Sequence, residues 1–453
     1  MGGGSGKEPK EDPNIDRVIS LIKSNVEGFR NIYDSESYGT QSSFKPHCHP
    51  PNEIQKEITD FRLQLRESCR NTEAKPVRIL AAALLNTRDE VKANIGKLAT
   101  VKRDMRKQRQ RLLPPLPKEV QNLEIPAEWS TTRGEDARPF LIFDTGKSSE
   151  RAIAFGTEEA VKTLSRATQW YMDSTFCTSS DLFQQLYVIR GLKGDIPITC
   201  VYAFMTHKST SLYVKVLESV VRYMAEIGVS PNLSYIMIDF EAGVINAVSK
   251  VFGNSVKAKC CFFHLCQNSW KHIQGLGLSS VYKSQPTIKL YCGMMDALAF
   301  LPVKDLSAGM LYLWSTAPVE LADLLLYFEQ TYVGGPVGSV VQATFPPSLW
   351  NMHEIVLAGH DKTNNNCEAW NRRFKELVGR QNPSFWTVVQ ALQKDEALER
   401  TKMLLPTNDA QESRKKADEL QLRIFIREKC LQYNDGQLNI EDFLKSIGNR
   451  IRF

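Results

Sequence analysis

The sequence predicts an α/β fold in which helices flank a mixed β-sheet. Two observations support this prediction. Residues 235–238 are four apolar residues in a row, Tyr-Ile-Met-Ile, and Asp239 follows at once. Such a run is typical of a strand that is buried on both faces of a sheet. Around it, strand-like and helical patterns alternate along the chain, as they do in α/β proteins.

The composition is that of a globular protein of two or three domains. The chain has 453 residues, of which 42% are hydrophobic and 24% charged. No apolar run approaches the roughly 20 residues that cross a bilayer, so we expect no membrane association. The ten cysteines are irregularly spaced, unlike a secreted disulfide framework, and indicate a reducing intracellular compartment.

The N-terminal region offers an incomplete metal-binding pattern. Residues 1–13 begin with Met-Gly-Gly-Gly-Ser-Gly and are interpreted as an artificial linker or disordered segment. Within residues 14–52, His47 and His49 flank Cys48. Two histidines at this spacing can end a zinc finger, but zinc prefers four ligands and no cysteine precedes this cluster. We therefore expect a solvated loop here, and no zinc in this chain.

Residues 53–113 have a helical pattern throughout, and residues 75–111 divide into three short helices. A trihelical unit of this kind resembles a helix-turn-helix. Thr87 and Glu90 have the spacing of a capping box for the middle helix. The last helix carries six basic residues, Lys102, Arg103, Arg106, Lys107, Arg109 and Arg111. Two interpretations stay open: contacts with DNA phosphates, or a solvated face or nuclear-import patch.

A Pro-Pro-Leu-Pro run ends this helical region, and the pattern then changes to strands. The elements predicted within residues 114–274 are, in order, a hairpin (138–146 and 151–157), a helix (158–165), three strands (168–176, 183–192 and 196–206), a helix (211–227), the strand 235–238, a helix around 244–251 and a strand (258–265).

Three strands, a helix, a strand, a helix and a strand form the order of an RNase H-like core with five strands. In that topology the first and fourth strands lie side by side. Asp173 on the first strand and Asp239 at the end of the fourth would then meet at one edge of the sheet. The alternative is that Asp239 only caps the following helix.

A third acid is needed for a strong metal site, because two carboxylates bind magnesium weakly. Glu368 is the candidate. The apolar residues around it recur at helical spacing, and they are Cys367, Trp370, Phe374, Leu377 and Val378. Glu368 falls off this stripe, in the first turn of the predicted helix. The alternative is an acid that is favoured there only by the helix dipole.

Residues 114–379 resemble a Mutator-like element (MULE) transposase. The matching blocks, in the family's order, are "WYMDSTF", "FQQLYVI", "PITCVYAFMTHKS", "IMIDFEAGVINAV", "CCFFHLCQNSWKHIQGLGL", "ALAFLPV", "FPPSLWN" and "TNNNCEAWNRRF". The His-Cys-His-Pro-Pro cluster also resembles the tail of a FLYWCH-type zinc finger, although the cysteines of such a finger are absent.

The resemblance implies a DDE triad of Asp173, Asp239 and Glu368 that holds two Mg²⁺ or Mn²⁺ ions. It also implies that Cys261 and His264, the family's C-x-x-H motif, support the active site, and it implies double-stranded DNA as substrate. From their positions near the third acid, we expect three further residues to contact phosphates: Arg372, Arg373 and Lys375.

The resemblance further implies a helical insertion, which we place at residues 275–350. Residues 351–390 then carry the final core helix with the third acid, and residues 391–453 form a helical C-terminal region. That region is expected to dimerise or contact DNA, with a solvated helical tail as the alternative.

The expected function is that of a nuclear DDE-type DNA transposase, which cleaves DNA at the terminal inverted repeats of a transposon and transfers the strand into target DNA. A dimer or larger assembly is expected because two ends must be brought together. The alternative is a domesticated, transposase-derived protein that binds DNA or regulates without catalysis. A metal-dependent nuclease of another kind is disfavoured by the C-x-x-H and T-N-N blocks.

Overall fold

The computed structural model describes residues 53–451 with the exception of 73, 176–179, 181, 336–341, 380–381 and 406–413. The His47, Cys48 and His49 cluster lies outside the described residues. The chain divides into two compact units, Met1–Pro115 and Leu116–Phe453.

Four helices form the described part of the first unit. They are α2 (Glu53–Asn71), α3 (Pro76–Leu85), α4 (Asp89–Asn94) and α5 (Leu98–Arg111). Their apolar faces enclose one small core, which includes Phe61, Leu65 and Leu80. The three helices predicted over residues 75–111 are therefore confirmed, and α2 packs against all of them.

The predicted capping box is wrong. Helix α4 begins at Asp89 with Arg88 as its N-cap residue, and no side chain caps it. The hydroxyl of Thr87 instead donates a hydrogen bond to the carbonyl oxygen of Ala83, at 2.8 Å. Because only a short turn separates α3 from α4, Thr87 lies over the last turn of α3, where threonine readily bonds to the carbonyl four residues earlier.

The second unit is built on a seven-stranded mixed sheet with the order β1-β2-β5-β4-β3-β6-β7. The strands are β1 (Leu141–Asp144), β2 (Ala152–Phe155), β3 (Gln169–Thr175), β4 (Gln185–Lys193), β5 (Ile196–Met205), β6 (Tyr235–Ile238) and β7 (Lys257–Cys260). The prediction of five strands is wrong, because the predicted hairpin β1–β2 joins the sheet through antiparallel pairing of β2 with β5. Strand β7 is also shorter than predicted, because Phe262 already begins a helix.

Strands β3 and β6 are parallel neighbours, with Tyr171 opposite Met237. Two residues further along each strand come Asp173 and Asp239. The predicted adjacency of these strands is therefore confirmed, and both acids lie at the same edge of the sheet.

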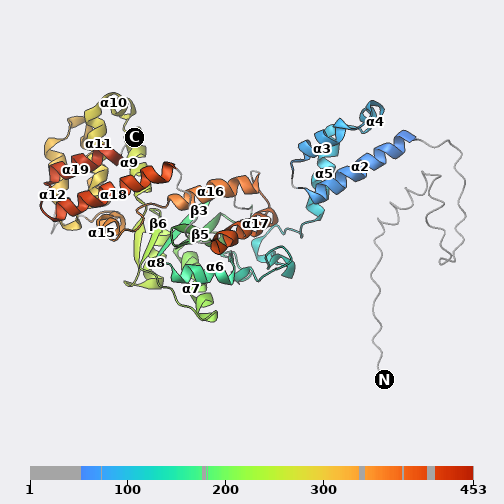
Figure 1. The fold of residues 1–453 in the computed structure, drawn as a ribbon, viewed down its shortest axis with the longest axis horizontal. Coiled ribbons are helices and arrows are strands. Elements are labelled where there is room, and N and C mark those ends of the chain that lie inside the picture. Colours follow the sequence, from blue (N-terminus) through green and yellow to red (C-terminus); the bar gives the residue numbers. More distant parts are fainter. Residues whose placement is uncertain are drawn as a thin grey trace, which may run out of the picture. The chain divides into compact units, whose positions relative to one another are not determined.

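Helices cover both faces of this sheet (Figure 1). One face carries α6 (Glu158–Arg166), α7 (Thr210–Glu226) and α8 (Ala242–Phe252). The other carries α16 (Asn365–Val378), which contacts β3, and α17 (Phe385–Leu404), which contacts β5. Side chains alternate between the faces along each strand, so Met172 enters the core under α6–α8 while Asp173 faces α16.

The remaining helices form a helical lobe beside the sheet (Figure 1). Those between β7 and α16 are α9 (Phe262–Gly275), α10 (Ser279–Ser284), α11 (Pro286–Ala297), α12 (Leu306–Thr316), α13 (Ala322–Phe328), the π-helix η7 (Glu329–Val333), α14 (Pro347–Trp350) and α15 (His353–Leu357). Five short 3₁₀ helices also occur in the described residues: η2 (Val120–Asn122), η3 (Ala127–Trp129), η4 (Leu298–Phe300), η5 (Val303–Asp305) and η6 (Val319–Leu321).

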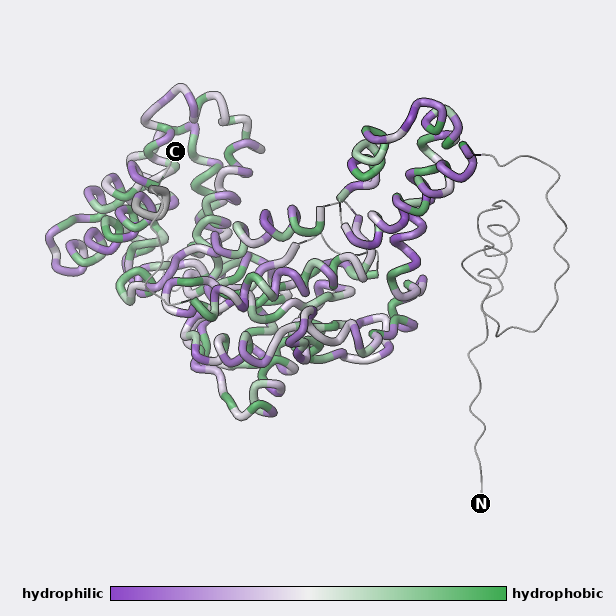
Figure 2. The backbone as a smooth tube through the Cα atoms, turned by 45° about the vertical axis from the view of Figure 1, so that its right-hand side comes forward, coloured by the Kyte–Doolittle hydropathy of each residue, from purple (hydrophilic) through white to green (hydrophobic). Residues whose placement is uncertain are grey.

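The C-terminal helices α18 (Arg414–Asn434) and α19 (Ile440–Ile451) belong to this lobe. Ile426, Phe443 and Ile447 are 0% exposed, and they lie in the same apolar core as α11 and α12. The alternative of a solvated C-terminal tail is therefore wrong. Helices alternate between hydrophilic and hydrophobic colours in Figure 2, as expected when one face of each helix is buried. Within the described ranges, no helix is both long and apolar enough to cross a membrane.

Two glycines allow α19 to cross α11 at close range. A Cβ atom on Gly293 would lie 2.3 Å from the carbonyl oxygen of Gly448, and one on Gly448 would lie 2.7 Å from the amide nitrogen of Met294. Both obstacles are backbone atoms, so they cannot move aside as a flexible side chain would. The contact between these helices therefore requires glycine at both positions.

We predict that Gly448→Ala destabilises the second unit by about 1–3 kcal/mol, because the added methyl group forces the two backbones apart. Thermal unfolding followed by circular dichroism measures the effect. Gly275→Ala in α9 is the matched control, since its Cβ would meet no atom within 4 Å. Equal melting temperatures of the two variants would contradict the close-crossing explanation.

Candidate active site

Asp173 is the most buried of the three predicted acids. It belongs to β3 and is 7% exposed. Its Oδ1 accepts a hydrogen bond from the backbone N–H of Ser174 at 2.8 Å, and its Oδ2 accepts one from Nδ2 of Asn371 in α16, also at 2.8 Å. Both carboxylate oxygens are thus held in place, and each keeps a lone pair for another partner.

Asp239 follows directly after β6, and its side chain lies against His264. The Nδ1 atom of His264, in the first turn of α9, is 2.7 Å from Oδ1 of Asp239. At this distance the two atoms form a close ion pair, and neither has a further hydrogen-bond partner within the described residues.

Glu368 lies in the first turn of α16, on the other side of the same imidazole. Its Oε1 is 3.7 Å from Nε2 of His264. The structure therefore brings the three predicted acids into one cluster, in which His264 lies between the second and the third.

The loop that leads into α16 joins the elements of this cluster. The backbone N–H of Asn364 donates to Sγ of Cys261 at 3.1 Å, and its Nδ2 donates to the carbonyl oxygen of Met172 at 3.0 Å. Asn364 is 0% exposed. The two motif residues therefore act differently: Cys261 binds the loop, whereas His264 contacts the acids.

A second anchor for the start of α16 comes from β4. The guanidinium of Arg190 donates to the backbone and side-chain oxygens of Asn366 and, at 3.0 Å, to Oγ1 of Thr199. Arg190 was not predicted from the sequence, because nothing in its local pattern distinguishes it. Asn371 was not predicted either, although it lies one helical turn after Glu368 on the same polar face.

Burial is the main cause that raises the pKa values of Asp173 and Glu368, and the charge of Asp239 adds to it. Burial, together with the negative charge of Asp239, raises the pKa of Asp173 to about 7, although the N–H of Ser174 and the charge of His264 oppose this shift. Burial also raises the pKa of Glu368, against the charge of His264. Both carboxyl groups therefore keep their protons to a higher pH than they would in water.

His264 is the internal cation of the cluster. Burial by itself lowers the pKa of its imidazole, but the contacts with Asp239 and Cys261 outweigh burial and raise the pKa to about 10. At neutral pH the ring is therefore protonated and lies between two carboxylates, which it partly neutralises.

The donor atoms fit a hard divalent cation. Mg²⁺ and Mn²⁺ prefer carboxylate and carbonyl oxygens, and a cation would relieve the repulsion among these acids. The carboxylate of Asp239 supplies such oxygens, of which Oδ1 is paired with Nδ1 of His264 at 2.7 Å. As the side chains stand, no group of three or more His, Cys, Asp or Glu residues in the described ranges is closed tightly enough to hold a metal ion. The ring of His264 lies between Asp239 and Glu368 and separates them.

Two of the predicted DNA-contacting arginines bind inside the protein. The Arg373 guanidinium contacts Asp395 at 2.6 Å and Glu399 at 2.5 Å, both on α17, and it neutralises these buried acids. The guanidinium of Arg109 donates to the carbonyl oxygen of Cys69 in the last turn of α2 and to those of Thr72 and Ala74, which follow this helix. These internal bonds argue against direct phosphate contacts by either side chain.

The other basic residues stay predictions as DNA contacts. Lys102 is half-buried. Five others are exposed, and they are Arg103, Arg106, Lys107, Arg111 and Arg372. Lys375 is exposed as well, one turn after Asn371 on α16.

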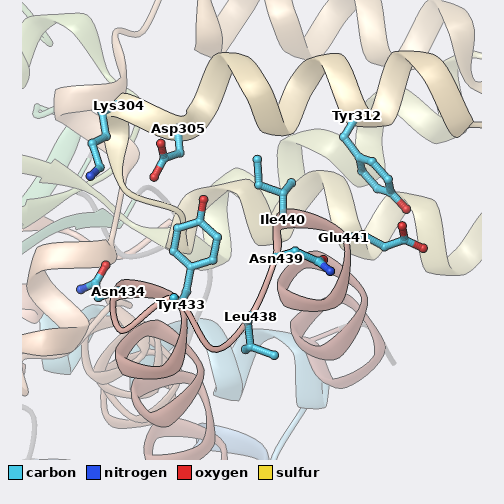
Figure 3. Close-up of a pocket in the computed structure, with 10 residues that line it drawn as sticks. Lys304, Asp305, Tyr312, Tyr433, Asn434, Leu438, Asn439, Ile440 and Glu441 are labelled. Carbon is cyan, nitrogen blue, oxygen red and sulfur yellow. The ribbon is translucent and has the colours of Figure 1, made fainter.

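A separate surface hollow lies in the helical lobe, between η5–α12 and the turn from α18 to α19 (Figure 3). Its polar groups are used within the protein. The side chain of Asn439 accepts a hydrogen bond from the backbone N–H of Asp442. Asn434 is hydrogen-bonded to His353, and Glu441 forms an ion pair with Lys445. None of the acids Asp173, Asp239 and Glu368 lines this hollow.

Comparison with known proteins identifies the segment that contains most of this cluster. Residues 169–268, from β3 into α9, match the family model of the MULE transposase domain. The matched segment includes Asp173, Asp239, Cys261 and His264, whereas Glu368 lies beyond it. No curated protein matches the chain. The resemblance inferred from the sequence blocks is thus confirmed for residues 169–268, which are similar to the MULE transposase domain.

Proposed function

We propose that this protein is a DDE-type DNA transposase with an RNase H-like catalytic core. The observation that supports this best is the convergence of Asp173, Asp239 and Glu368 from β3, β6 and α16 on one cluster. The order β5-β4-β3-β6-β7 within the sheet is consistent with such a core, to which β1 and β2 are added at one edge.

In this proposal the three acids hold Mg²⁺ or Mn²⁺. Two such ions, when bound, supply the activation of a water molecule or a DNA 3′-OH and the stabilisation of the departing 3′ oxygen. Asp173 is fixed for this role by Ser174 and Asn371, and Glu368 by the anchored start of α16. His264 carries a positive charge between Asp239 and Glu368 and can donate to a phosphate oxygen or to either acid.

The DNA would be bound outside the acid cluster by exposed cations. Arg372 and Lys375 lie on α16 near Glu368, and the exposed cations of α5 form a second basic surface on the first unit. Substrates of the proposed reaction are the two terminal inverted repeats and a target DNA duplex. The proposal accordingly includes a homodimer or larger assembly and a nuclear location.

Nicking of supercoiled plasmid in Mn²⁺ tests the catalytic proposal. Wild type is expected to nick, and Asp239→Ala is expected to fall to background, because metal-assisted hydrolysis requires this carboxylate. DNA affinity, measured by fluorescence anisotropy, is expected to be nearly unchanged. Glu376→Ala, at an exposed position of α16, is the control and should nick like wild type.

Nicking by wild type and Asp239→Ala to the same extent would contradict the proposal. A protein that binds DNA but shows neither nicking nor Mn²⁺ binding would support the alternative, a domesticated DNA-binding or regulatory protein.

A second prediction concerns stability rather than turnover. At a pH well above the raised pKa of Asp173, about 7, Asp173→Asn removes a buried negative charge beside Asp239, so the metal-free protein is expected to melt at a higher temperature than wild type. The same change is expected to abolish stabilisation by Mn²⁺. At a concentration a hundredfold above the dissociation constant, wild type should gain about 2.7 kcal/mol from Mn²⁺.

Differential scanning calorimetry with and without Mn²⁺ measures both effects. Asp435→Asn, at an exposed acid in the turn between α18 and α19, is the matched control and should behave like wild type in both conditions. A variant at Asp173 that melts lower without metal, or that gains as much from Mn²⁺ as wild type, would contradict the role given to this acid.

A further inference from the structure

Asn371 lies beside the acids, and the proposed function gives it one role, which is to hold the carboxylate of Asp173 in place. It lies one helical turn after Glu368 on α16, and its Nδ2 donates to Oδ2 of Asp173 at 2.8 Å. Its other polar atom, Oδ1, is buried and has no hydrogen-bond partner in the described structure. A buried carbonyl oxygen without a partner is unfavourable, and such groups in proteins commonly await a water, an ion or a ligand.

The position of this oxygen narrows the choice of partner. The amide nitrogen of Asn371 donates a hydrogen bond to Asp173, and the amide oxygen is attached to the same carbon atom, so this oxygen lies close to the carboxylate of Asp173. A second acceptor next to acids that already repel one another adds to the negative potential there, and only a cation or a donor would reverse this. Amide oxygens are also hard ligands, of the kind that Mg²⁺ and Mn²⁺ accept.

We propose that Asn371 is a fourth protein group of the metal centre. Its Nδ2 fixes the carboxylate of Asp173, and its Oδ1 contributes to the oxygen shell of the divalent ion that Asp173, Asp239 and Glu368 hold. This inference rests on the proposed function, because it presupposes a divalent ion at these acids. Asn371 is three residues after Glu368, so the side chains that would supply oxygen ligands to the ion lie on one face of α16.

Titration of the full chain with Mn²⁺, without DNA, tests this assignment. The free ion is measured by electron paramagnetic resonance after the protein has been freed of metal with a chelator. Asn371→Leu, which has a similar volume but no polar atoms, is expected to bind Mn²⁺ roughly tenfold or more weakly than wild type. Asn371→Asp is expected to bind at least as tightly as wild type, because a carboxylate oxygen replaces the amide oxygen.

Controls separate this inference from the function on which it rests. Glu376→Gln, on the exposed side of the same helix, should bind like wild type, and Asp239→Ala should bind far more weakly. If wild type binds no better than Asp239→Ala, the proposed metal site fails, and this inference fails with it. If wild type binds and Asn371→Leu binds equally well, only the role of Asn371 is overturned.

Melting temperatures of the metal-free variants exclude a purely structural role. The new carboxylate of Asn371→Asp loses the donor to Asp173 and repels it, so this variant should melt lower than wild type without metal, yet recover with Mn²⁺. Equal weakening of Mn²⁺ binding in Asn371→Asp and Asn371→Leu would mean that the side chain only supports the fold, and it would overturn the proposal.

Discussion

The clustering of three carboxylates, one buried and two half-buried, is the constraint around which this end of the sheet and its covering helices are organised. Parallel pairing of β3 with β6 brings Asp173 and Asp239 to one place, and α16 adds Glu368. Burial, together with the negative charge of Asp239, raises the pKa of Asp173. The surrounding groups limit this effect. The backbone N–H of Ser174 and the side-chain amide of Asn371 donate hydrogen bonds to Asp173, and the imidazolium of His264 lies between the other two acids.

A second layer of interactions keeps the third acid in place, although its helix comes from a distant part of the sequence. Cys261 and the carbonyl oxygen of Met172 bind Asn364, and Arg190 binds Asn366, so the start of α16 is fixed from two sides. Behind it, Asp395 on α17 accepts hydrogen bonds from Tyr202 and Trp370 and pairs with Arg373. Buried charges on α17 therefore connect the acid-bearing helix to the sheet.

The sequence was informative where local pattern and local chemistry agree. The apolar run before Asp239 and the order of strands and helices were enough to predict that two acids meet at one edge. Pairing between segments that are far apart left no such signal, so the addition of β1 and β2 to the sheet was missed. Charge was misleading for a related reason: Arg109 and Arg373 resemble their exposed neighbours in the sequence, and only the folded chain shows that they bind carbonyl oxygens and buried acids. Asn371 was missed because an asparagine on a polar helix face is ordinary without its partner.

The glycine crossing of α11 and α19 has a consequence for how the protein is made. Synthesis delivers α11 first, and α12 to α18 must all follow before α19 exists to cover it. Until then α11 packs only against its neighbours in the sequence, and the face that α19 covers stays open to aggregation or to wrong pairing within the lobe. The core of the lobe is therefore completed only after the end of the chain has been synthesised. A premature stop codon before α19 would remove the cover of this core while leaving every acid of the candidate site encoded.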